Sequence, residues 1–126
     1  MITVQTYGRC DEKTKNGRWG YKITFDDGSV KIERGTEKHT TANRMELTAI
    51  EKAFDVFCTY SLFKIIVESE YAKDVIDHNE TAVFYKSNSD IIRRIYKAVN
   101  TRTLLYDVEL AQQKESVPKT ERPQKR

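Results

Sequence analysis

Residues 41–47 read Thr-Ala-Asn-Arg-Met-Glu-Leu and open the longest helical pattern in the chain. The threonines at 40 and 41 supply hydroxyl groups that can cap the N-terminus of a helix. Apolar residues then recur at helical spacing, at Leu47, Ile50, Phe54 and Phe57. The pattern predicts an amphipathic helix from about Asn43 to Thr59, with one face in the core.

Three strand-like segments precede this helix. They cover residues 2–7, 19–25 and 30–34, and are apolar-rich with alternation of apolar and polar residues. Gly8 is expected to end the first segment, and Asp-Asp-Gly-Ser at residues 26–29 indicates a hairpin between the other two. The three segments predict an antiparallel meander.

The segments after the helix alternate between strand and helix. We expect, in chain order, a buried strand over 62–67, helices over 69–77 and 87–100, and a strand over 104–111. Asn88 or Ser89 is expected to cap the second of these helices. The order βββαβααβ predicts one α/β domain, a mixed five-stranded sheet (antiparallel meander, then parallel strands) flanked by helices.

Composition and charge fit a small globular protein. The chain has 126 residues, of which 38% are hydrophobic and 33% charged. Of its 22 basic and 19 acidic residues, five and two fall in residues 114–126, which leaves seventeen of each in residues 1–113. We therefore expect a domain over 1–113 and a basic, disordered tail over 114–126. Phosphate attraction would be local or assisted by the tail.

No segment has the length and apolarity of a membrane span, and the first residues do not resemble a signal peptide. Cys10 and Cys58 lack metal-ligand spacing and are expected to be reduced thiols. Together these features predict an intracellular, cytoplasmic protein without a membrane partner.

Four short motifs, taken with the element order, resemble ribonuclease H. Residues 43–47 resemble that family's Asn-Arg-Met-Glu-Leu helix opening, and residues 6–10 lie where it has Thr-Asp-Gly-Ser. Residues 17–21 resemble its glycine-rich entry to the second strand, and residues 67–71 lie where it has Asp-Ser-x-Tyr after the fourth. The resemblance covers residues 1–113 and implies a ribonuclease H-like fold. The family's C-terminal helix is expected to be missing, since only polar, tail-like sequence follows.

The resemblance implies hydrolysis of the RNA strand of RNA–DNA hybrids by two Mg²⁺ ions, held by four carboxylates. Glu46 matches the family's glutamate, and Glu68 stands in place of an aspartate, with one extra methylene. Tyr7 replaces the central aspartate, and the fourth carboxylate belongs to the missing helix. Glu46 and Glu68 are thus the candidate catalytic and metal-binding residues, and Mg²⁺ is expected only if the protein is active.

Four residues are candidates for nucleic-acid contact. Asn43 matches a family residue that contacts the minor groove and the 2′-hydroxyls of the hybrid, and Cys10 lies among loop residues that contact the strands through the backbone. Arg9 belongs to a basic rim around the first loop, formed with Lys13, Lys15 and Arg18. Glu70 replaces a neutral amide, and its charge should weaken the binding of phosphates.

Each of these residues also has a purely structural interpretation. Glu46 could serve only the dipole at the start of its helix, and Glu68 could simply face solvent at a strand end. Trp19 and Tyr21 are expected in the core rather than stacked on bases. Asp11 or Glu12 could supply a replacement carboxylate, although loop residues rarely reach such a site.

Three functions follow. The favoured hypothesis is a catalytically degenerate ribonuclease H-like protein that binds RNA–DNA hybrid, RNA or a protein partner. The alternative is a divergent, active ribonuclease H whose missing carboxylates come from the loop, from Glu115 or Glu121 in the tail, or from a second chain. The third is a phage- or virus-type accessory interaction protein, homodimeric or partner-bound through an apolar sheet face near Leu104 to Leu110.

Overall fold

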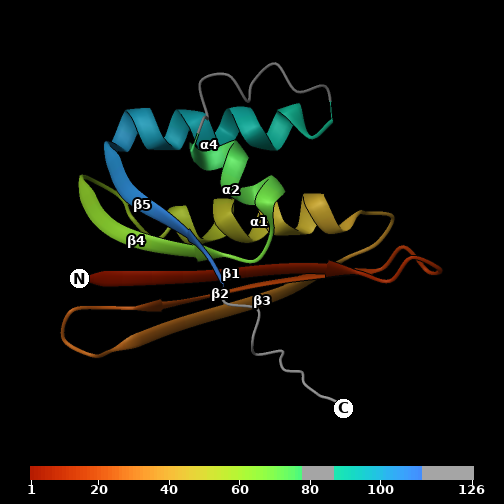
Figure 1. Ribbon diagram of the computed structural model, residues 1–126, viewed down its shortest axis with the longest axis horizontal. Coiled ribbons are helices and arrows are strands. Elements are labelled where there is room, and N and C mark those ends of the chain that lie inside the picture. Colours follow the sequence, from red (N-terminus) through yellow and green to blue (C-terminus); the bar gives the residue numbers. More distant parts are fainter. Residues whose placement is uncertain (78–86, 112–126) are drawn as a thin grey trace, which may run out of the picture.

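The computed structural model describes residues 1–77 and 87–111 (Figure 1). Its elements are β1 (Ile2–Cys10), β2 (Gly17–Thr24), β3 (Val30–Glu37), α1 (Ala42–Phe54), β4 (Ser61–Val67), α2 (Glu70–Asp77), α4 (Ser89–Arg102) and β5 (Leu104–Leu110). The predicted order of strands and helices is confirmed. The expected tail over 114–126 and the expected lack of a C-terminal helix lie outside the described residues.

The five strands form one mixed sheet in the order β3-β2-β1-β4-β5. β1 pairs antiparallel with β2, and β2 with β3, whereas β1 pairs parallel with β4, and β4 with β5. Figure 1 shows α1, α2 and α4 on the same side of this sheet. The predicted α/β fold, a meander followed by parallel strands, is confirmed.

The core lies between the sheet and α1, which is the helix nearest to the sheet. Trp19 and Tyr21 are buried there, as predicted, with 5% and 2% of their surface exposed. Aromatic rings from three elements continue the core toward β5, where Phe54 packs edge-on against Phe63, and Phe63 stacks on Tyr106. These contacts pack the end of α1 against β4 and β5.

Helix α1 ends at Phe54, five residues before its predicted end. The backbone N–H groups of Val56 and Phe57 bond three residues back, to Ala53 and Phe54, and this tighter turn terminates the helix. Phe57 is nevertheless buried and stacks on Phe63, with the ring centroids 4.6 Å apart. The helical spacing of apolar residues thus extends beyond the end of α1, and for this reason the predicted helix was too long.

Gly8 lies inside β1, so the prediction that it ends the strand was wrong. A Cβ atom at this position would lie 2.2 Å from the backbone nitrogen of Glu46 and 2.3 Å from the carbonyl carbon of Met45. Here α1 crosses β1 with no side chain between the two backbones. Glycine is needed for this close approach, and it places Glu46 directly above the strand.

No described helix covers the opposite face of the sheet. Apolar side chains are exposed there, as expected: Leu62 and Leu105, which are paired across β4 and β5, are 52% and 49% exposed. Farther along the same strands, Lys64 forms an ion pair with Glu109 at 3.4 Å. A protein partner or second copy on this face stays a prediction. Within the described residues, no helix is long and apolar enough to cross a membrane.

Candidate functional site

The predicted site residues come together where β1, β4 and α1 meet. Glu46 lies in the second turn of α1, and Glu68 directly follows β4. Tyr7 lies in β1, the strand that pairs with β4 on one side and β2 on the other. Parallel strands end at the same edge of a sheet, so β1 and β4 deliver their last residues to one place.

Glu46 is buried, with 8% of its surface exposed. Its Oε1 accepts a hydrogen bond of 2.6 Å from the Ser69 hydroxyl. Burial raises the pKa of the Glu46 carboxyl above its ordinary value of 4.5; the Ser69 hydrogen bond opposes this, and the charge of Glu68 adds to it. The repulsion expected between the two glutamates is thus present, although burial is the larger cause.

Ser69 was not among the predicted site residues. Its hydroxyl oxygen accepts a hydrogen bond from the backbone N–H of Ala72, in the first turn of α2, while its proton goes to Glu46. The signal available in the sequence was a serine directly before a helix, where serine commonly caps. That signal predicts the bond to Ala72 but not the one to Glu46.

Glu68 is exposed and forms an ion pair with Arg9. One nitrogen, Nη2 of Arg9, lies 3.1 Å from Oε1 and 3.4 Å from Oε2 of the carboxylate. The two side chains are 51% and 39% exposed, so solvent screens the pair. Arg9, a predicted nucleic-acid contact, thus forms an ion pair with one of the two candidate catalytic residues.

Tyr7 is half-buried and lies across Gly20 of β2: a Cβ atom at Gly20 would be 2.5 Å from its ring. The guanidinium carbon of Arg9 is 5.1 Å from the centroid of that ring, within the range of a cation–π interaction. Tyr7 and Glu68 also line a small hollow of about 250 Å³ on the open face of the sheet. Tyr7 therefore fills the space that a smaller acidic side chain would leave.

This donor set does not fit the two-metal site that the resemblance implies. Within residues 1–77 and 87–111, no group of three or more His, Cys, Asp or Glu side chains is placed to hold one ion. A phenol is uncharged at physiological pH and a poor ligand for Mg²⁺. Glu46 and Glu68 remain as the two acidic donors, and Glu68 already has a cationic partner.

The other predicted contact residues surround the site unevenly. Asn43 and Glu70 are exposed, at the starts of α1 and α2. The Cys10 thiol donates to the carbonyl oxygen of Thr40 at 3.3 Å, which ties the end of β1 to the residues before α1. Cys10 and Cys58 are both free thiols, as predicted.

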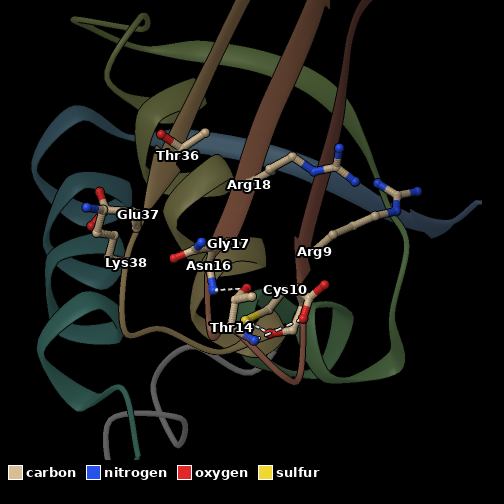
Figure 2. Close-up of a pocket in the computed structure, with 10 residues that line it drawn as sticks. Arg9, Cys10, Thr14, Asn16, Gly17, Arg18, Thr36, Glu37 and Lys38 are labelled. Atoms are coloured by element: carbon tan, nitrogen blue, oxygen red, sulfur yellow. Dashed lines mark hydrogen bonds between the residues drawn. The ribbon is translucent and has the colours of Figure 1, made fainter.

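A larger hollow of about 900 Å³ lies between the β1–β2 loop and the end of β3 (Figure 2). Arg9, Arg18 and Lys38 line it together with Asp11 and Glu37. Arg9 and Arg18 extend side by side from paired positions of β1 and β2. Two arginines of the predicted basic rim thus meet here, and Lys38, which the sequence did not suggest, joins them.

Asp11, one of the two candidate replacement carboxylates, is engaged within the first loop. Asp11 Oδ1 accepts hydrogen bonds from the backbone N–H groups of Lys13 and Thr14, at 2.8 and 3.0 Å. These bonds lower the pKa of the Asp11 carboxyl. Asp11 therefore closes its own loop.

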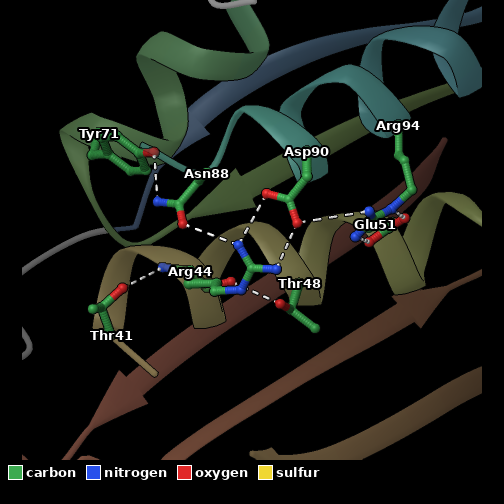
Figure 3. A network of polar contacts seen from close by, with 8 residues as sticks. All are labelled: Thr41, Arg44, Thr48, Glu51, Tyr71, Asn88, Asp90 and Arg94. Atoms are coloured by element: carbon green, nitrogen blue, oxygen red, sulfur yellow. Dashed lines mark hydrogen bonds and ion pairs between the residues drawn. The ribbon is translucent and has the colours of Figure 1, made fainter. Parts of the chain in front are cut away.

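A second polar cluster joins α1 to α4 (Figure 3). Arg44 donates from two nitrogens to the two oxygens of Asp90, at 3.1 and 2.7 Å. Arg94 bonds Glu51 at 2.6 and 3.3 Å. The hydrogen bonds from Arg44 hold the pKa of Asp90 well below its ordinary value of 3.8. We call these four residues the α1–α4 network.

Asn88, one of the two predicted capping residues, is the N-cap residue of α4, with a left-handed backbone of φ 64°, but makes no side-chain capping hydrogen bond. The amide instead donates to the Tyr71 hydroxyl at 3.2 Å and accepts from Arg44 at 3.3 Å. Figure 3 shows the amide between these two partners, which link α2 to the α1–α4 network.

Comparison with known proteins agrees with this architecture. A family model described as RNase H matches residues 1–119. Ribonuclease H of Rickettsia typhi is 30% identical over 115 residues, which cover 83% of this chain and 75% of that protein. Ribonuclease HI of Rickettsia prowazekii is 27% identical over 119 residues, covering 83% and 75%. Ribonuclease H of Rhodopseudomonas palustris is 28% identical over 113 residues, covering 82% and 72%.

The matched region spans every described element of the fold and all the candidate site residues. Both the extent of the family match and the coverage of the Rickettsia typhi protein exceed what a shared local motif would produce. The chain belongs to the ribonuclease H family.

Proposed function

We propose that this protein binds RNA–DNA hybrids through the hollow lined by Tyr7 and Glu68, which we call the cleft, together with Asn43 of α1, and that it lacks the two-metal hydrolysis of its family. One observation carries the proposal: Tyr7, which packs across Gly20 and lines the hollow beside Glu68, stands where the motif of the family places an aspartate. A neutral, bulky ring there removes one ligand and occupies its space.

Two features support hybrid binding: an exposed asparagine at the start of α1 and a group of basic residues. Asn43 is exposed at the start of α1, three residues before Glu46. Arg9, Arg18 and Lys38 place positive charge at the adjoining hollow, where phosphates could lie. Glu70, exposed at the start of α2, opposes this attraction. We therefore expect binding to be modest and strongly dependent on salt.

A cleavage assay tests the loss of hydrolysis. A labelled RNA–DNA hybrid with excess Mg²⁺ is incubated with the wild type and with Glu46→Gln, which removes the buried carboxylate. We expect no difference between the two in the rate of RNA cleavage. A wild type that cleaves faster than Glu46→Gln would overturn this part of the proposal.

Fluorescence anisotropy with the same hybrid tests binding, at a fixed salt concentration of about 0.1 M. Asn43→Ala should weaken binding and Glu70→Gln should tighten it, because the first removes a contact and the second removes a repulsive charge. Asn100→Ala, at the far end of α4, is the matched control and should change nothing. If the hybrid binds no better than duplex DNA, or the two cleft variants behave like the control, the cleft is not a hybrid-binding site.

A second candidate is a divergent but active ribonuclease H. The names of the relatives favour it, since proteins 27–30% identical to this chain are called ribonuclease H. It requires carboxylates from outside the described residues, for example Glu115 or Glu121. Cleavage that is lost on Glu46→Gln and on truncation after Gln113 would favour this candidate over the first.

A further inference from the structure

We infer that Arg9 acts as the resident cation of the cleft, fixed in place by Tyr7 and Glu68 where related clefts hold a divalent ion. The inference deepens the proposed function, because it states what replaces the metal. It concerns residues of this chain alone, and it is tested without nucleic acid.

The position of Arg9 is set by two independent contacts. Its Nη2 bridges both oxygens of Glu68, at 3.1 and 3.4 Å. Its guanidinium carbon lies 5.1 Å from the centroid of the Tyr7 ring, whose face carries the negative side of the quadrupole. The Glu68 carboxylate provides an opposite charge and the Tyr7 ring provides a flat surface, and together these two contacts position the guanidinium.

Tyr7 and Arg9 form a unit because they are two residues apart on one strand. Alternate residues of a strand share a face, so the two side chains lie next to each other on the open face of the sheet. An aspartate at position 7 could help to bind a free ion, and a small residue at position 9 would leave room for it. The aromatic ring and the arginine exclude such an ion together: one removes a ligand, and the other brings its own positive charge.

A tethered cation competes well with a dissolved one. The guanidinium is attached to β1 next to its partner, so its effective concentration at Glu68 is on the order of millimolar or above. Both side chains are partly exposed, at 51% and 39%, so the pair can open and exchange. A divalent ion must therefore displace Arg9 and overcome its charge before it can use Glu68.

Isothermal titration of the full chain with Mn²⁺, without nucleic acid, tests the inference. We expect Arg9→Ser to bind Mn²⁺ at least about tenfold more tightly than the wild type, a difference of about 1.4 kcal/mol. Arg9→Lys keeps the charge and should bind as weakly as the wild type. Arg93→Ser, which removes an exposed arginine of α4 away from the cleft, is the charge-matched control and should change the affinity less than about twofold.

Two further variants show whether the new binding occurs in the cleft. Adding Glu68→Gln to Arg9→Ser should abolish the gain, and adding Tyr7→Asp should increase it. The inference is wrong if the wild type already binds Mn²⁺ as tightly as Arg9→Ser, or if Arg9→Ser gains nothing while its circular dichroism spectrum shows a folded protein. Because hybrid binding and cleavage are measured separately, the proposed function can fail while this inference stands, and the reverse.

Discussion

The cleft and the α1–α4 network use the same residue types with opposite results. In the network, Arg44 meets Asp90 through two nitrogens and two oxygens, and a second arginine pairs with Glu51 (Figure 3). In the cleft, one nitrogen of Arg9 serves both oxygens of Glu68, and the neighbouring Glu46 is buried with a raised pKa. The arginine partner of Asp90 stabilises the ionised carboxylate, whereas burial destabilises the ionised form of Glu46.

The comparison indicates that the α1–α4 network contributes more to the stability of the fold than the cleft does. Bidentate pairs between Arg and a carboxylate are geometrically specific and join α1 to α4. Burial penalises the ionised form of Glu46 in the folded state and so raises its pKa, and carboxylates with perturbed pKa values are common at functional sites. The cleft therefore keeps one buried carboxylate with a raised pKa, although its donor set does not fit the two-metal site that the resemblance implies.

The largest effect on the free energy of unfolding is expected where the backbones of β1 and α1 meet beside the cleft. Gly8→Ala places a Cβ atom against the backbone of α1 and should destabilise the protein by more than about 3 kcal/mol. Gly28→Ala is the control: it has open space but a φ of 89°, so its strain should cost only about 1 kcal/mol. Denaturant unfolding measures both, and equal losses would mean that α1 can shift away from β1.

A smaller effect is expected in the network. Asp90→Asn should cost about 1 kcal/mol at pH 7, whereas Glu68→Gln in the cleft should cost less than about 0.5 kcal/mol, because both pairs are screened but one is bidentate. The lowered pKa of Asp90 means that its contribution is complete above 3.8 and is lost as the pH falls below that value. Urea unfolding at a series of pH values should show the cost of Asp90→Asn shrinking in acid. A cost that stays constant would contradict the role of the charge.

The smallest effect has the opposite sign. Glu46→Gln keeps an oxygen that accepts from Ser69 and removes the buried charge, so it should stabilise the protein by up to about 1 kcal/mol at pH 7. The raised pKa of Glu46 makes the penalty complete at high pH and absent once both states are protonated, below about 4.5. The gain should therefore vanish in acid. Exposed Glu70→Gln is the control and should leave the free energy of unfolding unchanged. If Glu46→Gln destabilises the protein at pH 7, burial does not penalise the charge of Glu46.

The sequence predicted most of the fold because its signals were local. Alternation in the strands, the apolar run of β4 and the helical stripe beginning at Leu47 each identify an element without knowledge of its neighbours. The errors arose where tertiary contacts decide. Phe57 returned to the core after α1 had ended, and Gly8 continued a strand because a helix crosses it.

The candidate site was predictable only in part. The motif located Glu46, Glu68 and Tyr7, and the structure brings all three to one end of the sheet. Their partners could not be predicted, because the contacts join residues far apart in the chain: Arg9 with Glu68, and Ser69 with Glu46. Whether these residues bind metal or nucleic acid stays a prediction.

The Ser69 hydroxyl takes part in two hydrogen bonds at once. It donates its proton to Glu46 and accepts the backbone N–H of Ala72. Any event that changes the charge on Glu46 must alter the polarity of that hydroxyl, and with it the first turn of α2. The amide resonance of Ala72 is therefore a built-in reporter. It can be followed by NMR in the unmodified protein and would register the arrival of a proton, an ion or a nucleic-acid strand at the cleft without a label there.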